Sequence, residues 1–129
     1  MVPLERKGEH EMKFINLKHE RSFYELLYEM KSIDPYHASY AYLLALIEAP
    51  VNDCFDFEQD KIKPDVVDKG WVSGTDYRIL KVALNLWNPY HSADISEVFG
   101  YIDSEIASYL FEAIRIRFEH VLLWNEEKS

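Results

Sequence analysis

Residues 53–65 read DCFDFEQDKIKPD and bring together carboxylates, a thiol, two lysines and two phenylalanines. Three of the carboxylates alternate along the chain as the first three ligands of a calcium-binding EF-hand loop do: Asp56, Glu58 and Asp60. The sixth position of such a loop is normally a glycine and the twelfth a bidentate glutamate, but Lys61 and Val67 stand there. The spacing therefore fails at both demanding positions, and we expect no metal site.

The only cysteine, Cys54, lies in the same stretch. A nucleophilic cysteine needs a nearby cation or helix N-terminus that lowers its pKa, whereas Asp53 and Asp56 would raise it. Cys54 is spaced with its apolar neighbours as in a helix, which predicts a small core residue and no catalytic role. Asp53 and Asp56 are then either partners of Arg78 or half of a binding site. The remaining acidic residues of the stretch are expected to be solvated: Glu58, Asp60 and Asp65.

The five histidines show no zinc-binding pair such as HExxH or HxxxH, so we expect no metal and no cofactor. His37 is the histidine of most interest, because it follows Asp34 by one helical turn inside an uncharged segment. It is either a ligand-binding residue or a hydrogen-bonded histidine at the edge of the core.

A second polar group surrounds the string GWVSGT at residues 70–75. A helix that starts at Thr75 offers free N–H groups, and Arg78 adds a bidentate donor, so together they could hold an anion or a carboxylate. In the alternative, Arg78 neutralises Asp53 or Asp56, and Trp71 covers the core. We predict no catalytic residue, and the candidates for binding a ligand or partner are His37, Asp53, Asp56, Trp71, Thr75, Arg78, Asn85 and Asn88.

Helical periodicity recurs along the whole chain. Asn16 is the predicted N-cap of an amphipathic helix over residues 17–31, and Asp34 followed by Pro35 starts the next helix. That second helix has no charge before Glu48, which predicts a central, buried position. Residues 51–58 are expected to form a short helix, and residues 59–74 a long ordered loop.

In the last part of the chain, Thr75 is the predicted cap of a helix that Pro89 stops. Residues 94–99 are predicted to form a short helical turn, and Asp103 the cap of a long final helix. No segment alternates β-branched residues as a strand does. We therefore predict an all-α bundle of about five helices, with a flexible arm at residues 1–11, a single domain over 12–125 and a tail at 126–129.

The composition describes a compact acidic protein. Of the 129 residues 48% are hydrophobic, and 23 acidic side chains exceed the 14 lysines and arginines, for a formal charge of −9. Such a charge repels phosphate backbones and anionic lipid, so direct nucleic-acid binding is not expected. With one cysteine, no signal peptide and no apolar run long enough to span a bilayer, we expect a cytoplasmic protein that does not enter membranes.

The chain resembles a family of small uncharacterised proteins found in Firmicutes genomes, phages and mobile elements. The resemblance covers about residues 12–90 and lies in the strings FINLKHERSFYELLYEMKSIDPYH, AYLLALI, NDCFDFEQDKIKP, DKGWVSGT and ALNLWN. The family's polar positions correspond to the binding candidates above together with Lys63, Gly70 and Trp87. Residues 48–50 replace a longer polar linker, often with a histidine, which argues against a metal or acid–base role there.

The resemblance implies a protein that acts by binding a host protein, and three functions remain open. The first is a non-enzymatic acidic binding protein, such as an inhibitor of a defence or nucleic-acid-handling system. The second is a pocket for a small ligand or nucleotide derivative, with or without enzymatic activity, formed by Asp53, Trp71, Thr75 and Arg78. The third is a structural or oligomerising domain, for which a homodimer is the simplest form.

Overall fold

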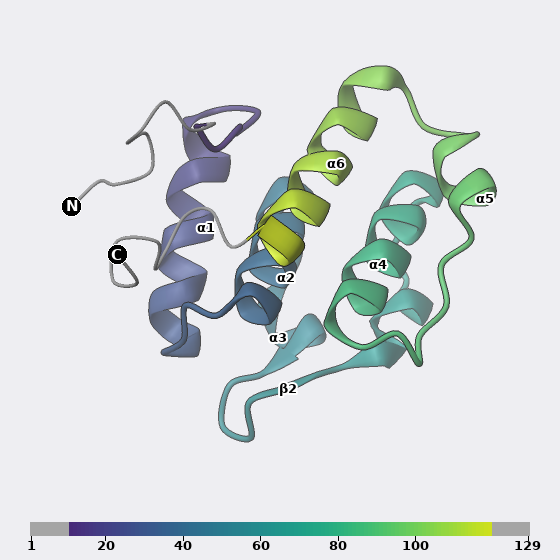
Figure 1. Cartoon of the computed structure of the whole chain (residues 1–129). Helices are drawn as coiled ribbons and strands as arrows, with labels where there is room; N and C mark the ends of the chain where they lie inside the picture. Colours follow the sequence, from purple (N-terminus) through teal and green to yellow (C-terminus); the bar gives the residue numbers. More distant parts are fainter. Residues whose placement is uncertain (1–10, 120–129) are drawn as a thin grey trace.

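The computed structural model describes residues 11–119 and confirms an all-α class (Figure 1). Four helices are long: α1 (Leu17–Met30), α2 (Pro35–Leu46), α4 (Gly74–Trp87) and α6 (Ser104–Glu119). The short elements are α3 (Val51–Cys54), the strands β1 (Phe55–Asp56) and β2 (Lys61–Ile62), the 3-10 helix η2 (Pro64–Asp68) and α5 (Ile95–Phe99). The predicted tail lies outside the described residues, as does the predicted arm apart from Glu11.

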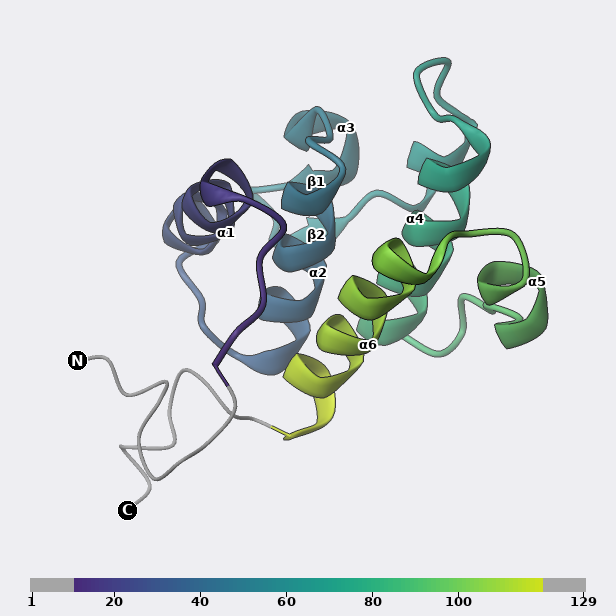
Figure 2. The same ribbon diagram turned by 90° about the horizontal axis from the view of Figure 1, so that it is seen from above.

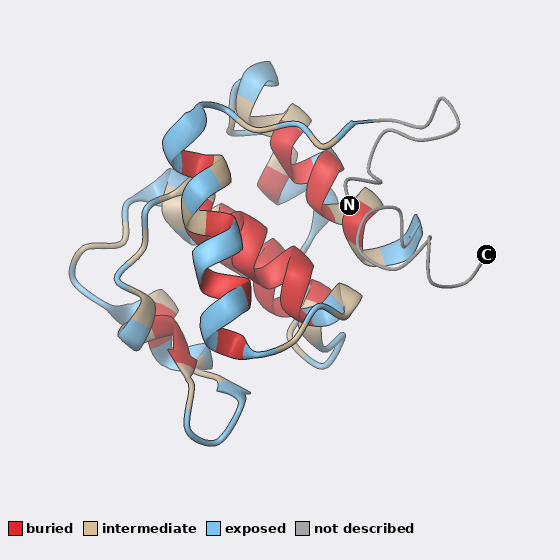
Figure 3. Ribbon diagram, turned by 90° about the vertical axis from the view of Figure 1, so that its left-hand side faces the viewer, coloured by how far each residue is buried: buried red, intermediate tan, exposed pale blue. Residues whose placement is uncertain are grey.

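Helix α2 occupies the centre of the molecule, as its lack of charge predicts. Its residues 37–45 are all buried, and α1, α4 and α6 pack around it (Figures 1 and 3). Because every side of α2 meets another helix, its sequence needs no polar face. Viewed from above, α1 and α4 lie on opposite sides of α2, and α6 lies beside α2, between it and α4 (Figure 2). Within residues 11–119, no helix has the length and apolar character needed to cross a bilayer.

Most of the predicted helix starts are confirmed by side-chain caps. The side chain of Asn16 accepts a hydrogen bond from His19 N, and that of Asp34 accepts one from His37 N. Asp94 and Asp103 cap α5 and α6 in the same manner. These starts depend on residues three positions apart, which is why the sequence alone reveals them.

The predicted cap at Thr75 is wrong. Ser73 is the N-cap of α4, since its side chain accepts from Asp76 N while the Asp76 carboxylate accepts from Ser73 N. This reciprocal capping box satisfies two N–H groups, whereas a cap at Thr75 would leave them without partners. Thr75 instead lies exposed in the first turn of α4.

The segment between α2 and α4 also differs from its prediction. The short helix ends at Cys54, where the chain enters β1, and the predicted loop contains β2 and η2. The strands form a two-stranded antiparallel hairpin, with Phe55 opposite Ile62. Asp60 takes a positive φ of 57° in the turn, and Asp56 Oδ1 accepts the backbone N–H groups of Glu58 and Gln59. Strands of two residues are too short for the alternation on which a sequence-based prediction depends.

Candidate functional site

His37 lies between two carboxylates that come from different elements. Its Nδ1 is 2.8 Å from Asp34 Oδ2 at the start of α2, and its Nε2 is 2.7 Å from Asp60 Oδ1 in the hairpin turn. The residue is only 7% exposed, and its ring makes an edge contact with Trp87 at 4.8 Å between centroids. We call the group Asp34, His37 and Asp60 the His37 link, because it joins the hairpin to α2. Asp60 is therefore more than the solvated carboxylate that the sequence predicts.

The His37 link favours a charged imidazole. Burial disfavours the charge, but the hydrogen bonds to Asp60 and Asp34 outweigh it and raise the pKa of His37 above its ordinary value. The pKa of Asp34 is lowered, because its hydrogen bonds with His37 and Ser32 outweigh its partial burial. With both ring nitrogens donating to carboxylates, His37 offers no free lone pair for proton abstraction or metal binding. Within residues 11–119, no group of three or more His, Cys, Asp and Glu side chains is placed to hold a metal ion.

Two members of the predicted ligand pocket do meet. Trp71 Nε1 donates to Asp53 Oδ2 at 2.9 Å, which ties the segment before α4 to α3. The neighbouring Cys54 is fully buried, and burial together with Asp53 raises the pKa of its thiol to about 12. The thiol is therefore protonated at neutral pH and packs as the predicted core residue.

The other two members of that pocket lie elsewhere. Arg78 donates from Nη1 to Gly74 O at 2.9 Å, and its guanidinium lies 4.9 Å from the ring centroid of Tyr101. The prediction that Arg78 neutralises Asp53 or Asp56 is therefore wrong. The hydroxyl of Thr75 forms no hydrogen bond with any residue that the structure describes. The structure thus pairs Asp53 with Trp71 but does not bring Thr75 and Arg78 to them.

The last predicted candidates hold loops in place. Asn85 Nδ2 donates to His91 O at 2.7 Å, which fixes the chain between α4 and α5. Asn88 follows the end of α4, and its Oδ1 accepts from Tyr90 N. Asp56 organises the hairpin turn, as described above. Each of these polar groups uses its hydrogen bonds to stabilise local backbone.

A groove between α4, α5 and α6 is the feature that the sequence analysis missed. It has a volume of about 190 Å³ and is lined chiefly by apolar side chains, among them Leu86, Ile95, Val98, Phe99, Ile114 and Phe118. We call it the α4–α6 groove. Ile95 is 75% exposed and Phe118 60%, while the half-buried Phe99 stacks on the exposed Phe111 at 5.0 Å. Such large exposed apolar side chains mark a surface suited to binding.

The sequence does contain a signal for this groove. On the final helix, Leu110 and Ala113 face the core. Phe111, Ile114 and Phe118 form a second apolar stripe with spacing i, i+3 and i+7. Ile114 is half-buried, packs against the core and also lines the groove. A helix with two apolar stripes has more apolar surface than one core contact needs, so the second stripe indicates another contact.

Acidic groups border the α4–α6 groove. Asp94 is one of its lining residues, and Glu97 lies one turn farther along the chain in α5. Neither carboxylate forms an ion pair with any of the described residues. Cations are also nearby: Arg78 and Lys81 line a small pocket together with Asp94 and Glu97. The Nε of Arg117 donates to Leu86 O, and its guanidinium lies over the rings of Tyr36 and Phe118. The border of the groove therefore carries both acidic and basic side chains beside its apolar walls.

Comparison with known proteins gives one match. Residues 9–128 match a family model described as Family of unknown function (DUF6075). The comparison with curated proteins found no match, and neither did the comparison with solved structures.

Proposed function

The chain belongs to the DUF6075 family, and we propose that it is a non-enzymatic binding protein whose α4–α6 groove receives an apolar side chain of a partner protein. The observation that carries this proposal is the exposed apolar lining of the groove, above all Phe118 and Ile95. Burying two such side chains contributes several kcal/mol to association, about 1.5–3 kcal/mol for each when burial is complete.

The negative charge of the chain indicates that the partner is basic. Asp94 and Glu97 beside the groove form no ion pair with the described residues, although Arg78 and Lys81 line a small pocket with them, and the whole chain has a formal charge of −9. A partner segment with an apolar anchor flanked by lysine or arginine would complement both features. An acidic protein that covers basic residues competes with nucleic acid for the same surface. The negative charge and the resemblance to phage and mobile-element proteins together support one form of activity. In this form, the protein inhibits a nucleic-acid-handling or defence protein of a Firmicute host.

The proposal is tested by site-specific photocrosslinking in the host cell. A photoreactive phenylalanine analogue at position 118 is expected to capture a defined partner with basic residues near the contact. The same analogue at position 90 is the matched control, because Tyr90 is 85% exposed on a neighbouring loop but does not line the groove.

The captured partner is then measured against two variants of the purified protein. Phe118→Glu is expected to weaken binding by about tenfold or more, since it places a charge against apolar atoms, while Tyr90→Glu keeps it. Binding should also weaken as salt is added, because the charges are exposed. The proposal would be contradicted if the analogue at position 118 captured no partner that the one at position 90 fails to capture. Equal binding of the partner by both variants would contradict it as well.

A further inference from the structure

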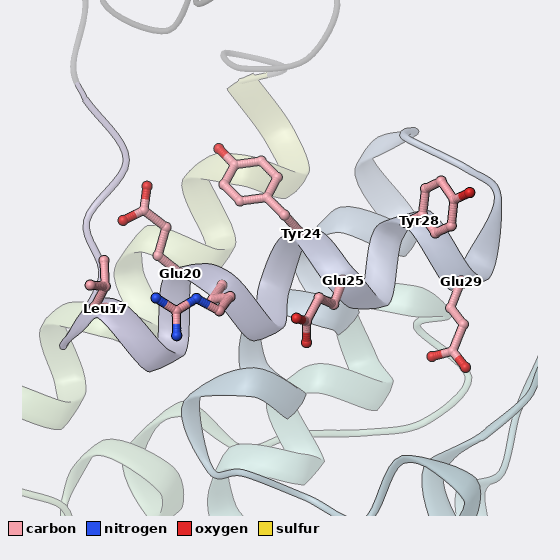
Figure 4. A pocket seen from close by; sticks show the side chains of 7 residues that line it. Leu17, Glu20, Tyr24, Glu25, Tyr28 and Glu29 are labelled. Atoms are coloured by element: carbon pink, nitrogen blue, oxygen red, sulfur yellow. The ribbon is translucent and has the colours of Figure 1, made fainter.

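Helix α1 carries a second exposed apolar surface, far from the α4–α6 groove. Its inner face packs on α2, while Leu17, Tyr24 and Tyr28 are 64%, 37% and 86% exposed on another face. These three residues have the spacing i, i+7 and i+11, so they form a stripe along the helix. Figure 4 shows them on α1 together with the carboxylates of Glu20, Glu25 and Glu29. We call this surface the α1 face.

The shape of the α1 face suits an extended partner. The surface is hollowed to about 700 Å³, but all seven residues that line it belong to α1 itself. A hollow with walls from a single helix cannot enclose a small molecule, whereas a second helix laid along the stripe covers Leu17, Tyr24 and Tyr28 at once.

The charge of α1 distinguishes it from the rest of the molecule. Residues 17–31 carry three basic and three acidic side chains in a chain whose formal charge is −9: Lys18, Glu20, Arg21, Glu25, Glu29 and Lys31. On the α1 face itself, Arg21 lies among Glu20, Glu25 and Glu29, while Lys18 pairs with Glu48. Two identical acidic molecules can therefore meet at this face only where the arginine of each lies against glutamates of the other.

The order of these charges selects one orientation. Arg21 lies in the N-terminal half of α1, and Glu25 and Glu29 lie in the C-terminal half. None of the three forms an ion pair with any residue that the structure describes. In a parallel pair related by a two-fold axis, each charge would lie beside its own copy and be repelled. In an antiparallel pair, Arg21 faces the turns that carry the two glutamates of the second copy.

We propose that the protein forms a homodimer through antiparallel contact of two α1 faces, with the two-fold axis beside Tyr24. Leu17 and Tyr28 of each copy cover the apolar stripe of the other, and Arg21 lies against Glu25 and Glu29 across the interface. Because one helix from each copy supplies the contact, the interface is at the small end of specific complexes, below roughly 1,200 Å². A dimer with so small an interface is expected to be weak and to dissociate on dilution.

The full-length chain tests this proposal by sedimentation equilibrium. The wild type is expected to be dimeric at high concentration and monomeric on dilution. Arg21→Glu brings like charges together in the homodimer, and so does Glu25→Arg combined with Glu29→Arg, so both variants are expected to dimerise about tenfold more weakly. An equimolar mixture of these two variants restores opposite charges at both contacts. It is expected to dimerise as the wild type does, and Phe118→Glu is expected to leave the wild-type dimer unchanged.

Cysteine crosslinking provides a measurement that does not depend on charge. Tyr24→Cys places a thiol beside the proposed axis, and the native Cys54 is fully buried, so mild oxidation is expected to crosslink the dimer through position 24. Glu58→Cys in the exposed hairpin turn is the control and should remain uncrosslinked. A wild type that is monomeric at every concentration, or a mixture of charge variants that stays monomeric, would overturn the proposal. If another segment of the same chain covers the α1 face, the mixture of charge variants is expected to stay monomeric.

Discussion

His19 and His37 are both buried, yet their surroundings favour opposite charge states. Ile15 N donates to His19 Nδ1, so Nε2 carries the proton and donates to Tyr42 O at 3.0 Å. Burial lowers the pKa of His19, and the hydrogen bond to Tyr42 offsets this only in part. His37 instead donates from both nitrogens to carboxylates, which raises its pKa. The neutral ring is thus required at His19 and the charged ring at His37.

Asp60→Asn is expected to weaken the His37 link in a pH-dependent manner. The pKa of His37 is raised in the folded state, so the link contributes fully below the unfolded value of 6.5 and is lost as pH rises through the folded pKa. The variant should lower the free energy of unfolding by about 1 kcal/mol at acidic pH, because Asp60 is exposed, and by less at alkaline pH. Asparagine tolerates the positive φ at this position, so the backbone is not a second cause.

Urea denaturation at several pH values measures this effect, and an NMR titration assigns the pKa values of His37 and His19. Glu58→Gln is the matched control, since it removes the same charge from the same turn without touching His37. An equal loss of stability for both variants, or a loss for Asp60→Asn that does not change with pH, would show that the link is not a charged one.

At the scale of elements, the start of α4 decides how the segment after the hairpin is held. The capping box of Ser73 and Asp76 sets the first turn. Two residues before it, Trp71 bonds to Asp53 of α3, so the chain is anchored on both sides of Val72. Because both anchors are hydrogen bonds of side chains, single substitutions can test them without changing the core.

Ser73→Ala and Thr75→Ala distinguish the observed cap from the one that the sequence predicts. Loss of the Ser73 side chain leaves an N–H group of α4 without its acceptor and is expected to cost about 1 kcal/mol of stability. Thr75→Ala should change stability by less than about 0.5 kcal/mol, because Thr75 is exposed and alanine favours helix. The measurement is thermal or urea unfolding of both variants, and a larger cost at position 75 would refute the capping box.

At the scale of the whole molecule, the two proposed binding surfaces lie at opposite ends. Figure 1 shows α1 on one side of α2 and α5 on the far side, beyond α4. The α1 face carries Arg21 among three glutamates, whereas the α4–α6 groove is bordered by Asp94 and Glu97. A dimer through α1 would therefore leave both grooves open, so two partner molecules can bind each dimer.

The separation predicts that the two activities are independent. Tyr28→Glu is expected to weaken dimerisation while leaving the affinity of the groove for its partner unchanged, and Phe118→Glu is expected to do the reverse. Light scattering reports the mass of each complex, and titration calorimetry reports the partner affinity. Loss of both activities in one variant would contradict the independence of the two surfaces if that variant is folded. Circular dichroism shows whether the variant is folded.

The sequence by itself determined the helical class, the buried position of α2, the helical turn at residues 94–99 and the caps at Asn16, Asp34 and Asp103. These features depend on residues within one or two turns of each other, so their pattern is visible along the chain. Only the tertiary structure decided that Asp60 meets His37 across 23 positions, that Arg78 covers Tyr101, and that three helices enclose a groove. Each of these contacts depends on how separate elements pack together, and local sequence patterns do not encode that packing.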